Sequence, residues 1–93
     1  MSDILNELYA TILDRRDHPK PGSYTSSLFA AGEDEIVKKV GEEAIEVIVA
    51  ANGQTDQRLI EESADLLYHL WMLLAQRGVR PEQVMAELER RHR

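Results

Sequence analysis

The sequence contains no cysteine, and it has few aromatic residues, glycines and prolines. The absence of cysteine excludes disulfides, thiolate metal sites and thiol nucleophiles. Because Leu, Ile, Val, Ala, Glu and Arg dominate instead, the composition predicts an all-α protein. No apolar run approaches the length that crosses a membrane, and the Met1-Ser2-Asp3 start lacks the pattern of a targeting signal. We therefore expect a cytoplasmic protein with no membrane partner.

Basic residues are scarce in the middle of the chain. The formal net charge is -6, and ten of the acidic residues lie between Glu33 and Asp65, against Lys38, Lys39 and Arg58 as bases. A nucleic-acid-binding surface would have the opposite sign, so no nucleic-acid partner is expected. The acidic region is therefore either a solvated surface or a metal site. The 93 residues predict a single domain, residues 1–93, with a small core.

Four segments have apolar residues at helical spacing. We expect helices from about Asp3 to Asp17, from Glu33 to Ala51, from Thr55 or Asp56 to about Arg77, and from Pro81 onward. Residues 18–27 contain two prolines and a glycine, which predict a loop. The turn between the second and third helices is short, so these two helices are expected to pack antiparallel.

Two acidic clusters border the apolar faces of these two middle helices. At 100° per residue, Glu43 and Glu46 fall at the edge of one face, and Glu62 and Asp65 fall at the edge of the other. Carboxylates beside a hydrophobic seam are costly unless they have a partner, because their charge loses its water. Antiparallel packing would place the four carboxylates across one groove. This arrangement predicts a divalent-cation site, and its oxygen ligands favour Mg²⁺, with Mn²⁺ as a substitute.

Each of these assignments has an alternative. A single acidic pair on a helix is more often a solvated face, and it is the coincidence of two pairs that favours a metal. Lys39 either neutralises Glu43 and Glu46 or reaches a phosphate. His69, one turn after Asp65, either contacts a carboxylate or the substrate, or is satisfied at a helix–helix seam. A di-iron site is not expected, because the chain lacks the required Glu-x-x-His triplets.

The hydroxyl-rich segment Ser23-Tyr24-Thr25 has two interpretations of its own: it binds phosphate or ribose, or it caps the loop. Arg15 lies at the end of the first helix, where a cation is favoured in any case. Both are therefore candidate substrate contacts and also ordinary structural features.

Some apolar residues lie outside the main apolar faces. These are Ile45 and Val49 on the second helix, and Tyr68 and Met72 on the third. A helix that is apolar on two sides is buried on two sides. In a chain of this size the second cover is expected from another copy, so we predict a homodimer or a dimer of dimers.

The motif Glu-Glu-x-x-Glu followed by Glu-x-x-Asp resembles the all-α nucleoside triphosphate pyrophosphohydrolases, the MazG-like superfamily. Within this superfamily the chain resembles phosphoribosyl-ATP pyrophosphohydrolase. The similarity extends from Leu5 to about Leu88 and is carried by three segments: Ser23-Tyr24-Thr25, Lys38-Lys39-Val40-Gly41-Glu42-Glu43-Ala44 and Asp65-Leu66-Leu67-Tyr68-His69. The resemblance implies a MazG-like bundle of about four helices per chain, completed by dimerisation.

The resemblance also implies an activity: hydrolysis of phosphoribosyl-ATP to phosphoribosyl-AMP and pyrophosphate, the second step of histidine biosynthesis. The Mg²⁺ would be bound by Glu43, Glu46, Glu62 and Asp65 and would bridge the phosphates. Glu42 would orient the attacking water, although the sequence does not separate a base from a metal ligand, so both Glu42 and Glu43 are candidate catalytic residues. The candidate substrate-binding residues are Lys39, Arg15, Ser23, Tyr24, Thr25 and His69.

Two other functions are open at this point. A housekeeping pyrophosphohydrolase for ordinary or modified nucleoside triphosphates would share the acidic motif and would differ in the Ser23–Thr25 segment. A non-catalytic helical dimerisation module would bind no Mg²⁺. For such a module, replacing Glu43 and Asp65 by their amides would leave its behaviour unchanged.

Overall fold

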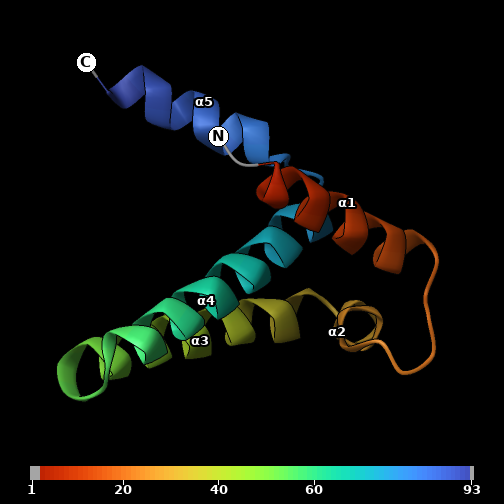
Figure 1. Ribbon diagram of the computed structural model, residues 1–93. Coiled ribbons are helices and arrows are strands. Elements are labelled where there is room, and N and C mark those ends of the chain that lie inside the picture. Colours follow the sequence, from red (N-terminus) through yellow and green to blue (C-terminus); the bar gives the residue numbers. More distant parts are fainter. Residues whose placement is uncertain (1–2, 93) are drawn as a thin grey trace.

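The computed structural model describes residues 3–92, and this part of the chain contains five α-helices and no strand (Figure 1). The helices are α1 (Ile4–Asp17), α2 (Tyr24–Ala31), α3 (Glu33–Gly53), α4 (Asp56–Gln76) and α5 (Pro81–Arg91). The all-α prediction is confirmed. Met1 and Ser2, on which the expectation about a targeting signal rests, lie outside the described residues. Between residues 3 and 92, none of the helices combines the length and apolar character needed to cross a membrane.

Helix α2 was not predicted from the sequence, so the chain has one helix more than expected. The two prolines and Gly22, with φ 83°, mark a loop, but this loop ends at Ser23. The Ser23 hydroxyl oxygen accepts a hydrogen bond from the Ser26 amide at 3.1 Å, and it thereby caps the first turn of α2. At the other end, Gly32 has φ 104°, a conformation that favours glycine, and lets the chain turn directly into α3. The cap interpretation of Ser23 is therefore confirmed.

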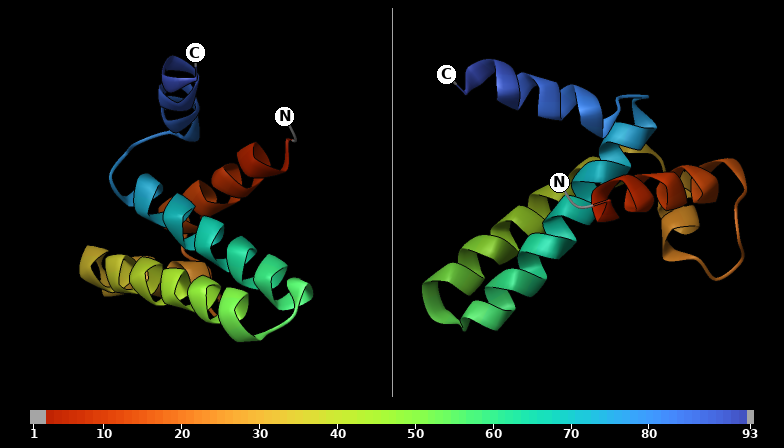
Figure 2. Two further views of the ribbon diagram at one scale, coloured as in Figure 1. Left: turned by 90° about the vertical axis from the view of Figure 1, so that its left-hand side faces the viewer. Right: turned by 45° about the horizontal axis from the view of Figure 1, so that its top comes forward.

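Helices α3 and α4 form an antiparallel hairpin and lie side by side in all views (Figures 1 and 2). Helix α3 continues through Gly53, two residues beyond the predicted end at Ala51. Thr55 then caps α4, because its hydroxyl oxygen accepts a hydrogen bond from the Arg58 amide at 3.2 Å. The short connection brings the predicted acidic strips of the two helices to the same side of the hairpin.

The core lies where α1 crosses the C-terminal half of α4, at the end of the hairpin far from its turn (Figure 2). Its buried members come from four helices: Tyr9, Ile12, Leu28, Ile36, Trp71, Met72 and Ala75. Three hydrogen bonds tie α1 to this region, one of them from Arg16 Nη1 to the Ala75 carbonyl at 2.8 Å. Trp71 Nε1 donates to the Leu5 carbonyl at 3.2 Å, and the Tyr9 hydroxyl donates to the Val79 carbonyl at 2.8 Å.

Met72 belongs to this core and is fully buried within the single chain. The expectation that Met72 needs a partner copy was therefore wrong: α1 and α4 cross at this point, and α1 covers the face of α4 that the helical wheel left open. Ile45 and Val49, by contrast, are exposed, together with Ile48 of α3. On α4, Ile60 and Leu67 are exposed in the same way.

Candidate active site

Three carboxylates converge in the seam of the hairpin. One oxygen from each of Glu43, Glu62 and Asp65 lies within 4.8 Å of the others. Glu43 comes from α3, and the other two come from successive turns of α4. Glu62 is buried, Glu43 is partly buried and Asp65 is exposed, so the cluster reaches from the seam to the surface. Three oxygen ligands on one side suit a hard divalent cation, whose remaining positions are left for water and phosphate oxygens.

Glu62 is the most constrained member of the cluster. Burial raises its pKa, Arg58 works in the opposite direction, and the nearby carboxylates of Asp65 and Glu43 raise it further. Arg58 lies one turn earlier on α4, and its Nη2 donates to Glu62 Oε2 at 3.1 Å. Since the pKa remains raised despite this contact, the single arginine does not compensate the three carboxylates. The sequence analysis counted Arg58 but overlooked that its i,i+4 spacing places it on Glu62.

Lys39 lies on the α3 side of the cluster. Its Nζ is 3.4 Å from Glu42 Oε1 and 3.9 Å from Glu43 Oε2. Partial burial tends to lower the pKa of Lys39, but Tyr24 and the two carboxylates outweigh this and raise it. The ammonium is therefore charged at neutral pH, partly buried and next to the predicted metal ligands. The structure is compatible with both roles considered for Lys39, neutralising carboxylates and contacting a phosphate.

Glu46, the fourth predicted ligand, lies outside the three-carboxylate cluster and is exposed. The pKa of Arg58 is raised first by its hydrogen bond to Glu61 and then by the charge of Glu62. Glu46 lies close enough to Arg58 to raise it further. Glu61 is exposed, pairs with Arg58 and Gln57, and lies outside the three-carboxylate cluster. Glu46 as a metal ligand stays a prediction.

His69 is buried one turn after Asp65, and its two ring nitrogens have distinct partners. Nδ1 lies 2.7 Å from the Asp65 carbonyl oxygen, which only accepts, so Nδ1 carries the proton and donates. In the neutral ring Nε2 then accepts, and the Tyr24 hydroxyl, 2.8 Å away, donates to it. Burial raises the pKa of Tyr24, although Lys39 opposes the shift, so Tyr24 keeps its proton at neutral pH. His69 therefore connects the first residue of α2 to the backbone of Asp65.

Tyr68 and Thr25 extend this connection. The Thr25 and Tyr68 hydroxyl groups are hydrogen-bonded, and Tyr68 lies edge-on to His69 with ring centroids 5.0 Å apart. Tyr24 also lies edge-on to His69, at 5.7 Å. The predicted residues Tyr24, Thr25 and His69 thus form one cluster beside the carboxylates. Tyr68 completes it, and the sequence analysis had placed this tyrosine at a dimer contact instead.

Arg15 and Ser23 lie together on the other side of the α2 N-terminus. Both line a hollow of about 330 Å³ whose other lining residues are Lys20, Pro21 and Gly22. Arg15 Nη1 donates to Asp14 Oδ2 at 2.7 Å. The predicted site residues therefore form two groups: the carboxylates with Lys39 and the aromatic cluster, and this hollow.

An all-α bundle in which a Glu-Glu-x-x-Glu helix faces a Glu-x-x-Asp helix has the features of the MazG-like nucleoside triphosphate pyrophosphohydrolases. Comparison with known families identifies the member. The family described as phosphoribosyl-ATP pyrophosphohydrolase matches residues 5–92, so the chain belongs to that family, as its motifs predicted.

Individual relatives agree with this assignment. The chain is 54% identical over 89 residues to the phosphoribosyl-ATP pyrophosphatase of Pelotomaculum thermopropionicum, covering 96% of this chain and 91% of the relative. It is 52% identical over 90 residues to that of Sulfurisphaera tokodaii, covering 97% and 96%. It is also 49% identical over 84 residues to the histidine biosynthesis bifunctional protein HisIE of Thermoanaerobacter pseudethanolicus, covering 90% of this chain and 39% of that longer protein.

Proposed function

We propose that this chain hydrolyses phosphoribosyl-ATP to phosphoribosyl-AMP and pyrophosphate with a Mg²⁺ bound by Glu43, Glu62 and Asp65. The family and the names of its relatives support the substrate, and the bifunctional relative's name supports a role in histidine biosynthesis. The observation that carries the metal is the convergence of three carboxylates from two helices. A cytoplasmic location is part of the same proposal, because the substrate is a phosphorylated metabolite.

The donor set fits Mg²⁺. All three ligands are carboxylates, and zinc would favour nitrogen or sulfur donors. Burial raises the pKa of Glu62, Asp65 and Glu43 raise it further and Arg58 opposes the shift, so the ionised form of Glu62 is disfavoured in the metal-free cluster. A divalent cation would supply positive charge and would leave Glu62 ionised. Mn²⁺ is expected to substitute, since it accepts the same ligands.

Each residue of the site then has a role in hydrolysis. When bound by Glu43, Glu62 and Asp65, Mg²⁺ would offset the negative charge that develops on the leaving pyrophosphate. Lys39, charged and beside the carboxylates, would donate hydrogen bonds to a phosphate oxygen. Glu42, exposed at the rim, would accept a proton from the attacking water once the phosphates draw Lys39 away from it. Tyr24 and His69 would keep the Asp65 turn in place.

We include a homodimer in this proposal. Six exposed large aliphatic residues occur on the two helices of the hairpin, four on α3 and two on α4: Val37, Ile45, Ile48, Val49, Ile60 and Leu67. Clusters of exposed apolar side chains are unusual on a monomer and are typical of a subunit interface. A second copy of the chain carries the same exposed apolar residues, so each copy can cover those of the other. Assembly into a dimer of dimers is an extension of this prediction.

The test is pyrophosphate release from phosphoribosyl-ATP, measured with a panel of ordinary nucleoside triphosphates and with increasing Mg²⁺. We expect activity only with divalent cation present. Glu43→Gln and Asp65→Asn should each lower kcat/KM by at least about a hundredfold, because each removes a charged metal ligand. Circular dichroism should show that both variants keep their helices.

Glu61→Gln is the matched control, because it converts an exposed carboxylate of α4 that lies outside the cluster into its amide. It should retain nearly full activity. Full activity of the Glu43 and Asp65 variants would exclude the proposed ligands. Faster turnover of a plain nucleoside triphosphate would instead leave the metal site intact and overturn the substrate.

A further inference from the structure

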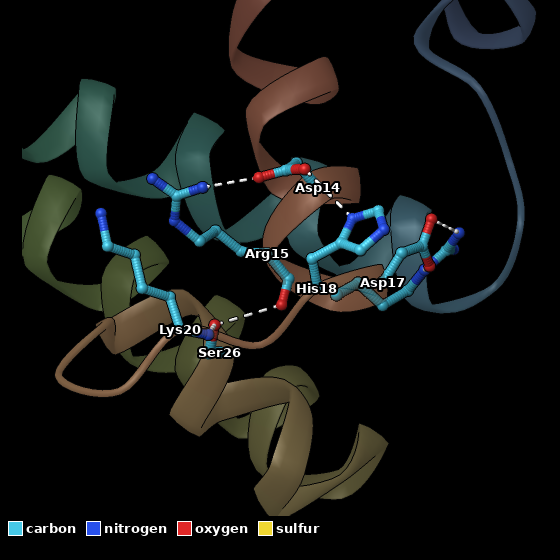
Figure 3. Close-up of polar contacts among 7 residues, drawn as sticks. Asp14, Arg15, Asp17, His18, Lys20 and Ser26 are labelled. Carbon is cyan, nitrogen blue, oxygen red and sulfur yellow. Dashed lines mark hydrogen bonds and ion pairs between the residues drawn. The ribbon is translucent and has the colours of Figure 1, made fainter.

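A positively charged hollow lies at the N-terminus of α2, and we call it the α2 hollow. It measures about 330 Å³ and is lined by Arg15, Lys20, Pro21, Gly22 and Ser23. None of these residues is acidic, although the whole chain has a formal charge of -6. Figure 3 shows that the Arg15 and Lys20 side chains extend to the same side of the loop that joins α1 to α2. In this acidic protein, the α2 hollow is a place suited to an anion.

Ser26 fixes the backbone at both cationic residues. Its hydroxyl donates to the Arg15 carbonyl at 3.1 Å and accepts from the Lys20 amide at 3.0 Å (Figure 3). One side chain of α2 thus ties the end of α1 to the middle of the loop. Pro19 and Pro21, on either side of Lys20, further restrict the backbone. The backbone positions from which the two cationic side chains extend are therefore restricted before any ligand arrives, which lowers part of the entropic cost of binding.

Both cations have hydrogen-bonding capacity left for a ligand. Within residues 3–92 the only carboxylate paired with Arg15 is Asp14, whose second oxygen is 3.2 Å from His18 Nδ1. No ion-pair partner of the Lys20 ammonium occurs in the same part of the chain. The Ser23 oxygen accepts from the Ser26 amide, which leaves the hydroxyl proton free to be donated. An arginine fork, an ammonium and a hydroxyl together suit a phosphate group.

We infer that the α2 hollow binds the phosphate monoester of the substrate's phosphoribosyl group, an inference that rests on the proposed function. Phosphoribosyl-ATP carries phosphate at two ends. Its triphosphate belongs at the carboxylate cluster, because that end is cleaved. The other phosphate needs a second cationic site. Ser23 lines the hollow and the next residue, Tyr24, contacts His69 beside Asp65, so the two sites adjoin across the first turn of α2.

This assignment makes the α2 hollow a determinant of specificity. ATP has the triphosphate but lacks the phosphoribosyl phosphate, so it would occupy the carboxylate cluster and leave the hollow unused. The same contrast exists between two monophosphates: AMP, which is not a product, carries only the phosphate next to the cleavage point, whereas the product phosphoribosyl-AMP also carries the phosphoribosyl phosphate. Substitution in the hollow should therefore affect ligands with the second phosphate and spare those without it.

The experiment compares wild-type enzyme with Lys20→Ala. The variant should raise KM for phosphoribosyl-ATP about tenfold, as expected for one lost charge-assisted hydrogen bond. The inhibition constant of phosphoribosyl-AMP should rise by the same factor, and that of AMP should stay unchanged. Arg15→Gln is the second variant, and it should have the same selective effect. Lys38→Ala is the matched control, since it removes the same charge from an exposed position on α3.

The outcomes separate the two proposals. If the wild type releases no pyrophosphate from phosphoribosyl-ATP, the proposed function fails. If the wild type is active and Lys20→Ala leaves KM unchanged, only the role of the α2 hollow fails. The role also fails if AMP inhibition weakens as much as phosphoribosyl-AMP inhibition, because the hollow would then bind the wrong phosphate. If Lys38→Ala raises KM for phosphoribosyl-ATP as much as Lys20→Ala does, the loss of any positive charge explains the effect, and the role of the α2 hollow also fails.

Discussion

At the scale of single residues, the carboxylate cluster combines two opposing demands. Glu62 is buried beside Glu43 and Asp65, and this position favours its protonated form. A metal ligand must instead be ionised. Arg58 relieves part of the conflict, and the remainder is a destabilising contribution that a cation would remove. Under the proposed function, the cluster would destabilise the metal-free protein and would gain the capacity to bind a cation.

The first prediction concerns Glu62→Gln in the presence of a chelator. Burial, reinforced by Asp65 and Glu43 and opposed by Arg58, raises the pKa of Glu62 above its value in the unfolded chain. The stability contributed by Glu62 is therefore present below the unfolded pKa and is lost as the pH rises through the folded pKa. Urea denaturation should show Glu62→Gln more stable than wild type at pH 7.5, with the difference vanishing near pH 4.

Two comparisons check this prediction. The pKa of Glu61 is lowered by hydrogen bonds from Gln57 and Arg58, so Glu61→Gln should show the opposite sign, and a small effect because Glu61 is exposed. Added Mg²⁺ should reverse the order of Glu62→Gln and wild type, because only the wild type keeps all three ligands. A variant less stable than wild type in chelator at pH 7.5 would contradict the argument.

At the scale of elements, α2 has the most consequences for function although it is the shortest helix. It supplies Tyr24 to His69 and Thr25 to Tyr68, and its N-cap residue Ser23 lines the α2 hollow. Its sequence has no charged residue and follows two prolines, so the local pattern indicated a loop. Its stability comes from the Ser23 cap and from Leu28, which is buried in the core.

The second prediction concerns this cap. Ser23→Ala removes the acceptor of the Ser26 amide and should lower the free energy of unfolding by about 1 kcal/mol, measured by urea denaturation. Ser27→Ala is the control: the Ser27 hydroxyl donates to the Tyr24 carbonyl and caps no helix N-terminus, so a smaller loss is expected. Equal losses in the two variants would show that the cap has no special contribution.

At the scale of the whole molecule, the chain buries only part of the apolar surface that its sequence provides. The contact line of α3 against α4 runs along Ile36 and Ala50, which are buried, while Val37 and Ile48 of the same apolar face are exposed. Helices α1 and α2 cover the far end of the hairpin and leave this face open (Figure 2). The uncovered face is the physical basis for the proposed dimer.

The third prediction tests that dimer. Light scattering should give the mass of a dimer for the wild type. Ile48→Asp should raise the dimer dissociation constant by about a hundredfold, because each copy loses an aliphatic side chain that the dimer would bury. Leu88→Asp, on the exposed face of α5, is the matched control and should leave the dimer intact. A monomeric wild type at micromolar concentration would exclude the dimer.

The sequence by itself determined which acids border a hydrophobic seam. Helical periodicity sets the angular position of each side chain, and it sufficed to narrow the many acidic residues to four candidate ligands, Glu43, Glu46, Glu62 and Asp65. It also sufficed for four of the five helices in the described part of the chain. The family followed from motifs that are local runs of sequence.

Only the tertiary structure decided how these parts meet. Glu46 lies outside the cluster because the contact line of α3 runs nearer Glu43, and the position of that line depends on packing against α4. Tyr24 reaches His69 across 45 positions, and Met72 is buried because α1 crosses α4. Periodicity fixes directions around one helix axis, whereas the distance and rotation between two axes depend on all the side chains packed between them. The carboxylates were therefore predictable as candidates, and the selection of three of them was made by the fold.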